Sequence, residues 1–175
     1  MTILDFYNKK SKDISSWLDI DQILNLNDLE FGQLSSANHL LFPLRKTSRR
    51  FGGPGITDQE IHQFKTNLFL RKKYFNVVLR TLKYFGFNID SSGNINMFDN
   101  FSEVKSRWVK KYSVEYSRIS RILQSMMLLG FDKIAYNFYN ILLEVDSVFP
   151  GEIDNRTKKY WELSVYDKGY WESKI

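Results

Sequence analysis

Helix-breaking residues are scarce in this chain, and their positions leave segments long enough for helices. Proline occurs at positions 43, 54 and 150 of the 175 residues, and glycine occurs nine times. Proline ends or kinks a helix because it lacks the backbone N–H and clashes with the preceding turn. Between these breaks, apolar residues recur every three or four positions, which is the spacing of one helix face. We therefore expect a mainly α-helical fold.

The apolar spacing predicts helices of different lengths. Short ones are expected at the N-terminus and around Ile23 and Leu24, with Asp19 or Asp21 as the cap. A helix capped by Asp28 should run to Leu41 and stop before proline, because the preceding residue is pushed out of the α region. Further helices are expected after Thr57 and over residues 68–85, 102–111, 115–129, 132–148 and 154–166, with 102–111 and 115–129 either separate or joined by a kink. The predicted architecture is all-α (mainly α), a single-domain bundle of about seven or eight helices over residues 1–175.

Local signals mark several element ends. Thr57 and Glu60 have the spacing of a capping box, in which each side chain binds the other residue's backbone N–H. Gly86 follows an apolar helix and suits the position after a helix, where a positive φ costs glycine little. The stretch NIDSSGNIN alternates apolar and polar residues around a Ser-Gly turn. A loop, or at most a short β-hairpin, is expected there, near residues 88–96.

Composition excludes several kinds of site. Apolar residues make up 43% of the chain, enough for a core, and cysteine is absent. The chain therefore has no disulfide scaffold, no thiol nucleophile and no cysteine zinc site. His39 and His62 are the only histidines, so we expect no metal site and no cofactor. Either histidine could act as a base if a carboxylate oriented it, and an enzyme with a histidine/arginine pocket is one of three functional hypotheses.

The sequence also bears on localisation. Charged residues interrupt the N-terminal segment, so no secretory signal peptide is expected. No apolar run reaches the roughly 20 residues that a membrane span needs. We expect a soluble intracellular protein, cytoplasmic or nuclear, with export without a classical signal left open.

Positive charge is concentrated in the middle of the chain. Residues 45–83 carry ten basic and two acidic side chains, whereas residues 1–44 carry three basic and six acidic ones. This basic zone could attract phosphates or an acidic partner, or it could neutralise the acidic terminal segments packed against it. The basic zone begins with the segment RKTSRR. We assign the basic residues of this segment to contact with a partner: Arg45, Lys46, Arg49 and Arg50.

Two further groups of basic residues follow the glycine at position 86. Arg118 and Arg121 are three positions apart in a helical segment, so both border the apolar stripe of that helix. They could pair with carboxylates inside the fold or bind an anion of a partner. The other group interleaves basic and aromatic residues, a composition that can bind nucleic acid by stacking on bases. Its members are Lys105, Arg107, Trp108, Lys110 and Lys111.

Several separated pieces occur in an order that resembles one family. They are LDFY (4–7), LLFPL (40–44), ITDQEIHQF (56–64), LKYFGF (82–87), RISRIL (118–123), LGF (129–131) and PGE (150–152). This ordered set is similar to the conserved domain of the opioid growth factor receptor family and extends over nearly the whole chain. The resemblance implies peptide or protein binding, since family members are described as binding an enkephalin peptide, and it implies no catalytic activity. The matched residues of most interest are Phe42, Pro43, Arg118 and Arg121.

The leading hypothesis is therefore a non-catalytic helical interaction domain that binds a peptide or protein partner, and the basic patch would suit an acidic one. The alternative is electrostatic nucleic-acid (DNA or RNA) binding through the basic middle region. The third is the enzyme with a histidine/arginine pocket.

Overall fold

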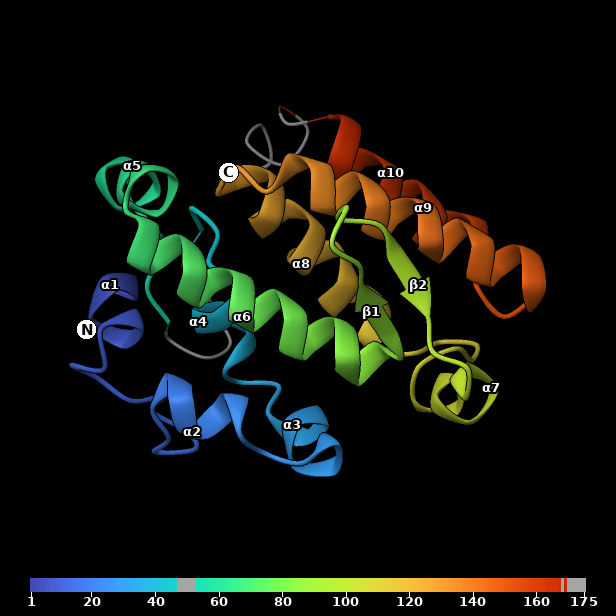
Figure 1. The fold of residues 1–175 in the computed structure, drawn as a ribbon, viewed down its shortest axis with the longest axis horizontal. Coiled ribbons are helices and arrows are strands. Elements are labelled where there is room, and N and C mark those ends of the chain that lie inside the picture. The colour runs from blue at the N-terminus through green and yellow to red at the C-terminus, as the bar shows by residue number, and fades with distance from the viewer. Residues whose placement is uncertain (47–52, 168, 170–175) are drawn as a thin grey trace. The chain divides into compact units, whose positions relative to one another are not determined.

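The computed structural model describes residues 1–46, 53–167 and 169, and helices dominate these segments (Figure 1). The mainly α-helical fold class is confirmed. Contacts along the chain divide it into two compact units, residues 1–84 and 85–175. Compact units can belong to one domain, so the single domain over residues 1–175 stays a prediction. Among the described residues, no helix has the length and hydropathy needed to cross a membrane.

Unit 1 consists of short helices followed by a long one. They are α1 (Ile3–Tyr7), α2 (Ile20–Leu24), α3 (Asp28–Gln33), α4 (Asn38–Leu41), α5 (Asp58–Thr66) and α6 (Leu68–Phe85), whose last residue lies beyond the unit boundary. The expected end before Pro43 is confirmed, because α4 stops at Leu41. The expected helix from Asp28 to Leu41 is divided in two, however. The chain leaves α3 at Leu34, and the Ser36 hydroxyl in the interruption donates a hydrogen bond to Asp13 Oδ2 at 3.3 Å.

Capping boxes start most of the short helices. The predicted box of Thr57 and Glu60 is present at the start of α5, and Asp19 caps α2 as expected. At α3 the cap is Asn27 rather than Asp28, which is the first helical residue. A helix of five or six residues is marginal by itself, because nucleation fixes several residues for few hydrogen bonds. Caps and packing therefore hold these helices in place.

Aromatic side chains form the core of unit 1. Tyr7 lies edge-on to Phe64, with ring centroids 4.8 Å apart, and its hydroxyl donates a hydrogen bond to the Leu41 carbonyl at 2.7 Å. Tyr74 of α6 packs edge-on against Phe42 and Phe64, each with a centroid distance of 6.1 Å. All four of these aromatic side chains are fully buried. The family-matched Phe42 is thus a core residue.

Part of the basic zone binds the N-terminal segment of the same unit. Lys73 Nζ donates to the Tyr7 carbonyl at 2.7 Å. Arg80 pairs with Asp28 at 3.0 Å and lies over the Phe31 ring, 4.2 Å from its centroid. Because Lys73 also lies 4.0 Å from Asp21, the structure supports the neutralising alternative for Lys73 and Arg80 rather than partner contact.

Unit 2 contains a β-hairpin followed by helices. Its elements are β1 (Phe87–Ile89), β2 (Ile95–Met97), α7 (Phe101–Val104), a 3-10 turn (Lys105–Arg107), α8 (Glu115–Leu128), α9 (Asp132–Val148) and α10 (Asn155–Tyr166). The structure forms the short hairpin that the sequence set as the upper limit here, with Asn88 paired to Asn96 in an antiparallel register. The hairpin lies beside α9, and Asn137 donates a hydrogen bond to the Gly93 carbonyl at 2.7 Å (Figure 1).

Two features around the start of unit 2 follow from close packing. Gly86 has a φ of +90°, and a Cβ there would approach the Phe101 and Val104 side chains to 2.9 Å, so the expected role of this glycine is confirmed. The helix expected over residues 102–111 is shorter. It begins at Phe101, and an α-turn and a 3-10 turn end at Arg107. The buried Trp108 follows, and its indole N–H donates to the Phe85 carbonyl at 3.0 Å.

Candidate functional site

Helices α8 and α10 of unit 2 run in the same direction side by side. The Trp161 indole donates to the Tyr116 carbonyl at 3.1 Å, and Gln124 Nε2 donates to Ser164 Oγ at 3.3 Å. From the first contact to the second, the residue number increases in α8 and in α10, so the two helices are parallel. Helix α9 connects them and contacts both. The fully buried Trp161 ring anchors α10 in the core of the unit.

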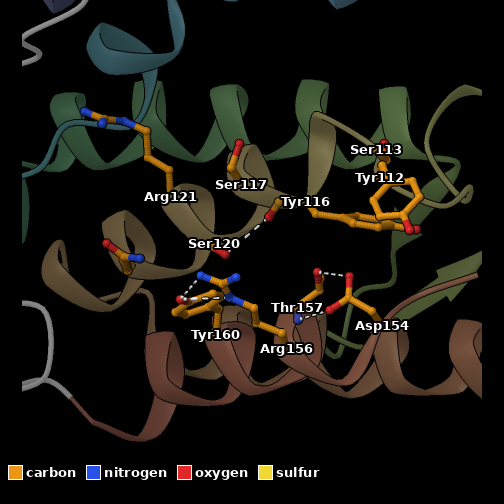
Figure 2. Close-up of a pocket in the computed structure, with 11 residues that line it drawn as sticks. Tyr112, Ser113, Tyr116, Ser117, Ser120, Arg121, Asp154, Arg156, Thr157 and Tyr160 are labelled. Carbon is orange, nitrogen blue, oxygen red and sulfur yellow. Dashed lines mark hydrogen bonds between the residues drawn. The ribbon is translucent and has the colours of Figure 1, made fainter.

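A groove of about 560 Å³ lies along this helix pair. Tyrosines, arginines and hydroxyl side chains dominate its lining, as Figure 2 shows. The lining residues are Tyr112, Ser113, Tyr116, Ser117, Ser120, Arg121, Gln124, Asp154, Arg156, Thr157 and Tyr160. All of them belong to unit 2, so the groove is a feature of this unit.

The α10 wall presents hydrogen-bond donors. Arg156 and Tyr160 are one helical turn apart, and Arg156 Nε and Nη2 donate to the Tyr160 hydroxyl oxygen at 3.3 and 3.2 Å. The guanidinium also lies over the Tyr160 ring, 5.5 Å from the centroid. A cation held over an aromatic face by hydrogen bonds has a restricted orientation. Figure 2 shows this pair at the centre of the α10 wall.

Asp154 is used by the helix that it precedes. Its carboxylate accepts hydrogen bonds from the Thr157 backbone N–H at 2.8 Å and from the Thr157 hydroxyl at 2.9 Å. These bonds, first the one from the backbone, lower the pKa of the Asp154 carboxyl below its ordinary value. Asp154 is therefore the N-cap of α10 and stays ionised at neutral pH.

The α8 wall presents hydrogen-bond acceptors. The Ser117 hydroxyl donates to the Val114 carbonyl at 3.0 Å, and the Ser120 hydroxyl donates to the Tyr116 carbonyl at 3.2 Å. A serine hydroxyl has one hydrogen and two lone pairs. Because both hydrogens are directed to the helix backbone, the oxygens offer lone pairs to the groove.

Tyr116 forms part of the floor of the groove. Its ring is nearly perpendicular to that of Trp161, with centroids 5.6 Å apart, and its hydroxyl donates to the Glu152 carbonyl at 3.4 Å. Burial raises the pKa of the Tyr116 hydroxyl to about 12, because the phenolate is poorly solvated there.

Tyr112 lies at the end of the groove on an unusual backbone conformation. Its φ is +60°, in the left-handed region, and its side chain is 94% exposed. This region costs a residue with a Cβ roughly 1–2 kcal/mol. Such strained residues occur preferentially at functional sites. A large exposed ring held on a strained backbone at the edge of a groove is a candidate contact residue.

The structure separates the two arginines that the sequence grouped together. Arg118 is 7% exposed, pairs with Glu115 at 3.4 Å and lies over the Phe85 ring at 5.9 Å. Arg121 lines the groove. Arg118 therefore pairs with a carboxylate inside the fold, which was one of the two alternatives. Of the two arginines, Arg121 is the one that lines the groove.

The predicted contact residues of the basic segment lie in unit 1. Arg45 pairs with Asp58, while Lys46 is exposed. Arg49 and Arg50 lie outside the described residues. His39 and His62 also lie in unit 1, on α4 and α5, and neither lines the groove of unit 2.

The predicted nucleic-acid residues lie before α8. Arg107, Lys110 and Lys111 are exposed, and the Lys105 ammonium lies over the Phe149 ring at 4.5 Å. Trp108, by contrast, is fully buried and hydrogen-bonded. A buried ring cannot stack on a base, so the structure removes Trp108 from this surface set.

Of the residues that line the groove, the sequence signals had singled out only Arg121. Arg156 and Tyr160 have the i,i+4 spacing of neighbours on one helix face, and this spacing is the signal that could have grouped them. The pairing of α8 with α10 has no comparable local signal.

The described fold is that of a mainly α-helical protein whose second unit carries a tyrosine- and arginine-lined groove. The family model of the opioid growth factor receptor (OGFr) conserved region matches residues 1–169. The chain belongs to this family, and the resemblance drawn from the ordered motifs is confirmed. Comparisons with curated proteins and with solved structures find no match.

Proposed function

We propose that the chain is a non-catalytic interaction domain whose unit 2 groove binds an extended peptide segment of a protein partner. The observation that carries the proposal is the opposite hydrogen-bonding character of the two walls. Ser117 and Ser120 offer acceptors, whereas Arg156 offers donors. A peptide backbone has both kinds of group and can bind both walls at once.

The spacing on the walls also suits an extended chain. Ser120 and Gln124 on one wall, and Arg156 and Tyr160 on the other, are each four residues apart. Four helical residues rise about 6 Å along the axis. An extended peptide repeats its backbone direction every two residues, over about 6.6 Å. Successive outward groups of a bound strand can therefore meet successive side chains of each helix.

The aromatic lining supports a protein or peptide ligand. Tyr112, Tyr116 and Tyr160 line the groove together with two arginines. Tyrosine and arginine are enriched among the residues that dominate binding energy at protein interfaces. The family description, which refers to the receptor of a growth factor, accords with this type of ligand.

Selection from a random nonapeptide library displayed on phage, with the whole chain as the target, tests the proposal. We expect selected peptides to bind the wild-type chain. Ser120→Trp should weaken this binding by more than tenfold, because the indole would occupy the groove. Asn140→Trp is the matched control, since it places the same ring on an exposed position of α9 outside the lining.

Two results would contradict the proposal. One is a selection that yields no specific binder. The other is a set of binders whose affinity is the same for the wild type, Ser120→Trp and Asn140→Trp, because their site would then lie elsewhere. Melting curves of both variants establish that each is folded.

Nucleic-acid binding is the second candidate function, supported by the exposed cluster of Arg107, Lys110 and Lys111. No acidic residue occurs between positions 104 and 114. Such a site would bind through phosphates, so its affinity should fall steeply with salt. Titration of single-stranded DNA and RNA 20-mers at 50 and 200 mM salt tests it. Absence of binding at 50 mM would eliminate this function.

A further inference from the structure

We infer that the peptide segment taken by the groove is acidic, and that one of its carboxylate or phosphate groups lies against Arg156. This inference rests on the proposed function and adds the chemical class of the partner. It depends on the charges of the groove, on the fixed orientation of Arg156 and on the lysines next to Tyr112.

The formal charge of the lining is positive. Among the described lining residues, Arg121 and Arg156 are the cations and Asp154 is the only anion. The Asp154 carboxylate is directed to the Thr157 amide and hydroxyl as the cap of α10. If the carboxylate turned towards a ligand, α10 would lose the hydrogen bonds of its N-cap. A cationic peptide therefore lacks a mobile carboxylate in the groove, whereas an anionic one meets the Arg156 guanidinium on the α10 wall (Figure 2).

Arg156 is oriented before any ligand arrives. Two of its nitrogens bind the Tyr160 hydroxyl, and its guanidinium lies over the Tyr160 ring. Long side chains lose rotamer freedom when they bind, and this loss reduces affinity. Because Tyr160 has already restricted Arg156, less freedom is lost when an anion binds. A planar guanidinium is also well matched to carboxylate and phosphate oxygens.

The end of the groove extends the positive charge. Lys110 and Lys111 are exposed and directly precede Tyr112 in the sequence. The nearest acidic residue that follows is Glu115, which is 8% exposed and pairs with Arg118. An acidic segment that continues past Tyr112 would therefore meet lysines rather than carboxylates. Such surfaces accelerate association with oppositely charged partners.

The test uses fluorescein-labelled nonapeptides from the phage selection and copies in which each Asp or Glu is changed to Asn or Gln. We expect the selected peptides to be enriched in acidic residues. At least one acid-to-amide change should weaken binding to the whole wild-type chain by about tenfold or more, the typical effect of losing a hydrogen bond to a charged group. The same change should have less than a twofold effect on Arg156→Gln.

Lys159→Gln is the matched control. Lys159 is on the same helix, is exposed and pairs with Glu162, and it does not line the groove. The Lys159→Gln replacement removes the same formal charge but leaves the groove lining unchanged. The acid-to-amide change should therefore still weaken binding to this variant. Arg156→Lys should restore part of the affinity, because charge returns without the planar guanidinium.

The outcomes separate the two proposals. The acidic preference would be overturned if the peptides blocked by Ser120→Trp are neutral or basic, or if their binding is insensitive to Arg156→Gln. Either result would leave groove binding intact. Binding insensitive to Ser120→Trp would overturn both. Copies with phosphoserine in place of the critical acid identify the source of the anion. Tighter binding of the phosphoserine copy supports a phosphopeptide, and weaker binding supports a carboxylate.

Discussion

The Arg156 guanidinium is held by the Tyr160 hydroxyl one turn later in α10, with Nε and Nη2 at 3.3 and 3.2 Å from the phenolic oxygen. Both partners belong to the same helix, so this contact does not require the packing of another element. The groove thus has a donor whose position is determined locally, on a wall that faces serine acceptors from α8.

Tyr160→Phe separates positioning from folding. The variant keeps the ring beneath Arg156 but removes the oxygen that accepts its two hydrogen bonds. Because this interaction is at the surface, we expect the free energy of unfolding to change by less than about 0.5 kcal/mol. The affinity for a groove-binding peptide should fall several-fold, because Arg156 becomes more mobile. Urea unfolding and fluorescence polarisation measure the two effects, and an unchanged affinity would refute the positioning role.

Tyr112→Gly and Tyr112→Ala form a pair that distinguishes strain from contact. Both remove the ring, so both should weaken peptide binding to a similar extent. Only glycine adopts a φ of +60° without a steric penalty. The glycine variant should therefore be more stable than the alanine variant by about 1 kcal/mol. Thermal and urea unfolding provide the comparison, and equal stabilities would show that the backbone at Tyr112 is not strained.

Phe42→Ala should be strongly destabilising because the ring is fully buried against Tyr74. We expect a loss of about 3–5 kcal/mol in the free energy of unfolding, the usual range for removing a buried phenylalanine. Phe69→Ala is the control, since that ring is 59% exposed and its removal should cost much less. Similar losses for the two variants would mean that Phe42 is not part of the unit 1 core.

Gly53 and His39 are predicted to be coupled. A Cβ on Gly53 would lie 1.7 Å from His39 Cδ2, and His39 is 5% exposed. Gly53→Ala should therefore destabilise the chain by at least about 1 kcal/mol, through overpacking. In a His39→Ala background the same change should cost much less, since the imidazole is gone. A double-mutant cycle by urea unfolding measures this coupling, and additive effects would contradict it.

The burial of Tyr116 predicts a loss of stability at alkaline pH. Its pKa is raised to about 12 in the folded state, above the ordinary value of 10. The folded chain therefore holds this proton more tightly than the unfolded chain does, and the resulting stability is present below pH 10 and lost between pH 10 and 12. Tyr116→Phe should reduce the slope of unfolding free energy against pH in this window. An unchanged slope in urea unfolding from pH 9 to 12 would exclude this contribution.

Local features of the chain were predictable from the sequence because they depend on residues close to one another. The Thr57–Glu60 box, the glycine after α6 and the hairpin near residues 88–96 are each decided within a few residues. The helices 68–85 and 132–148 were predicted with their observed limits, since long apolar periodicities leave little freedom. The ordered motifs likewise predicted the family.

The candidate site was decided by tertiary structure. Tyr116 and Trp161 are 45 positions apart, and their contact depends on α9 bringing α10 back beside α8. Periodicity shows that a helix has an apolar face but does not name the helix that covers it. For the same reason, sequence alone could not tell that Arg118 would be buried beside Glu115 while Arg121 lines the groove. The sequence determined the long helices and the family; packing between distant helices decided which polar side chains form a site.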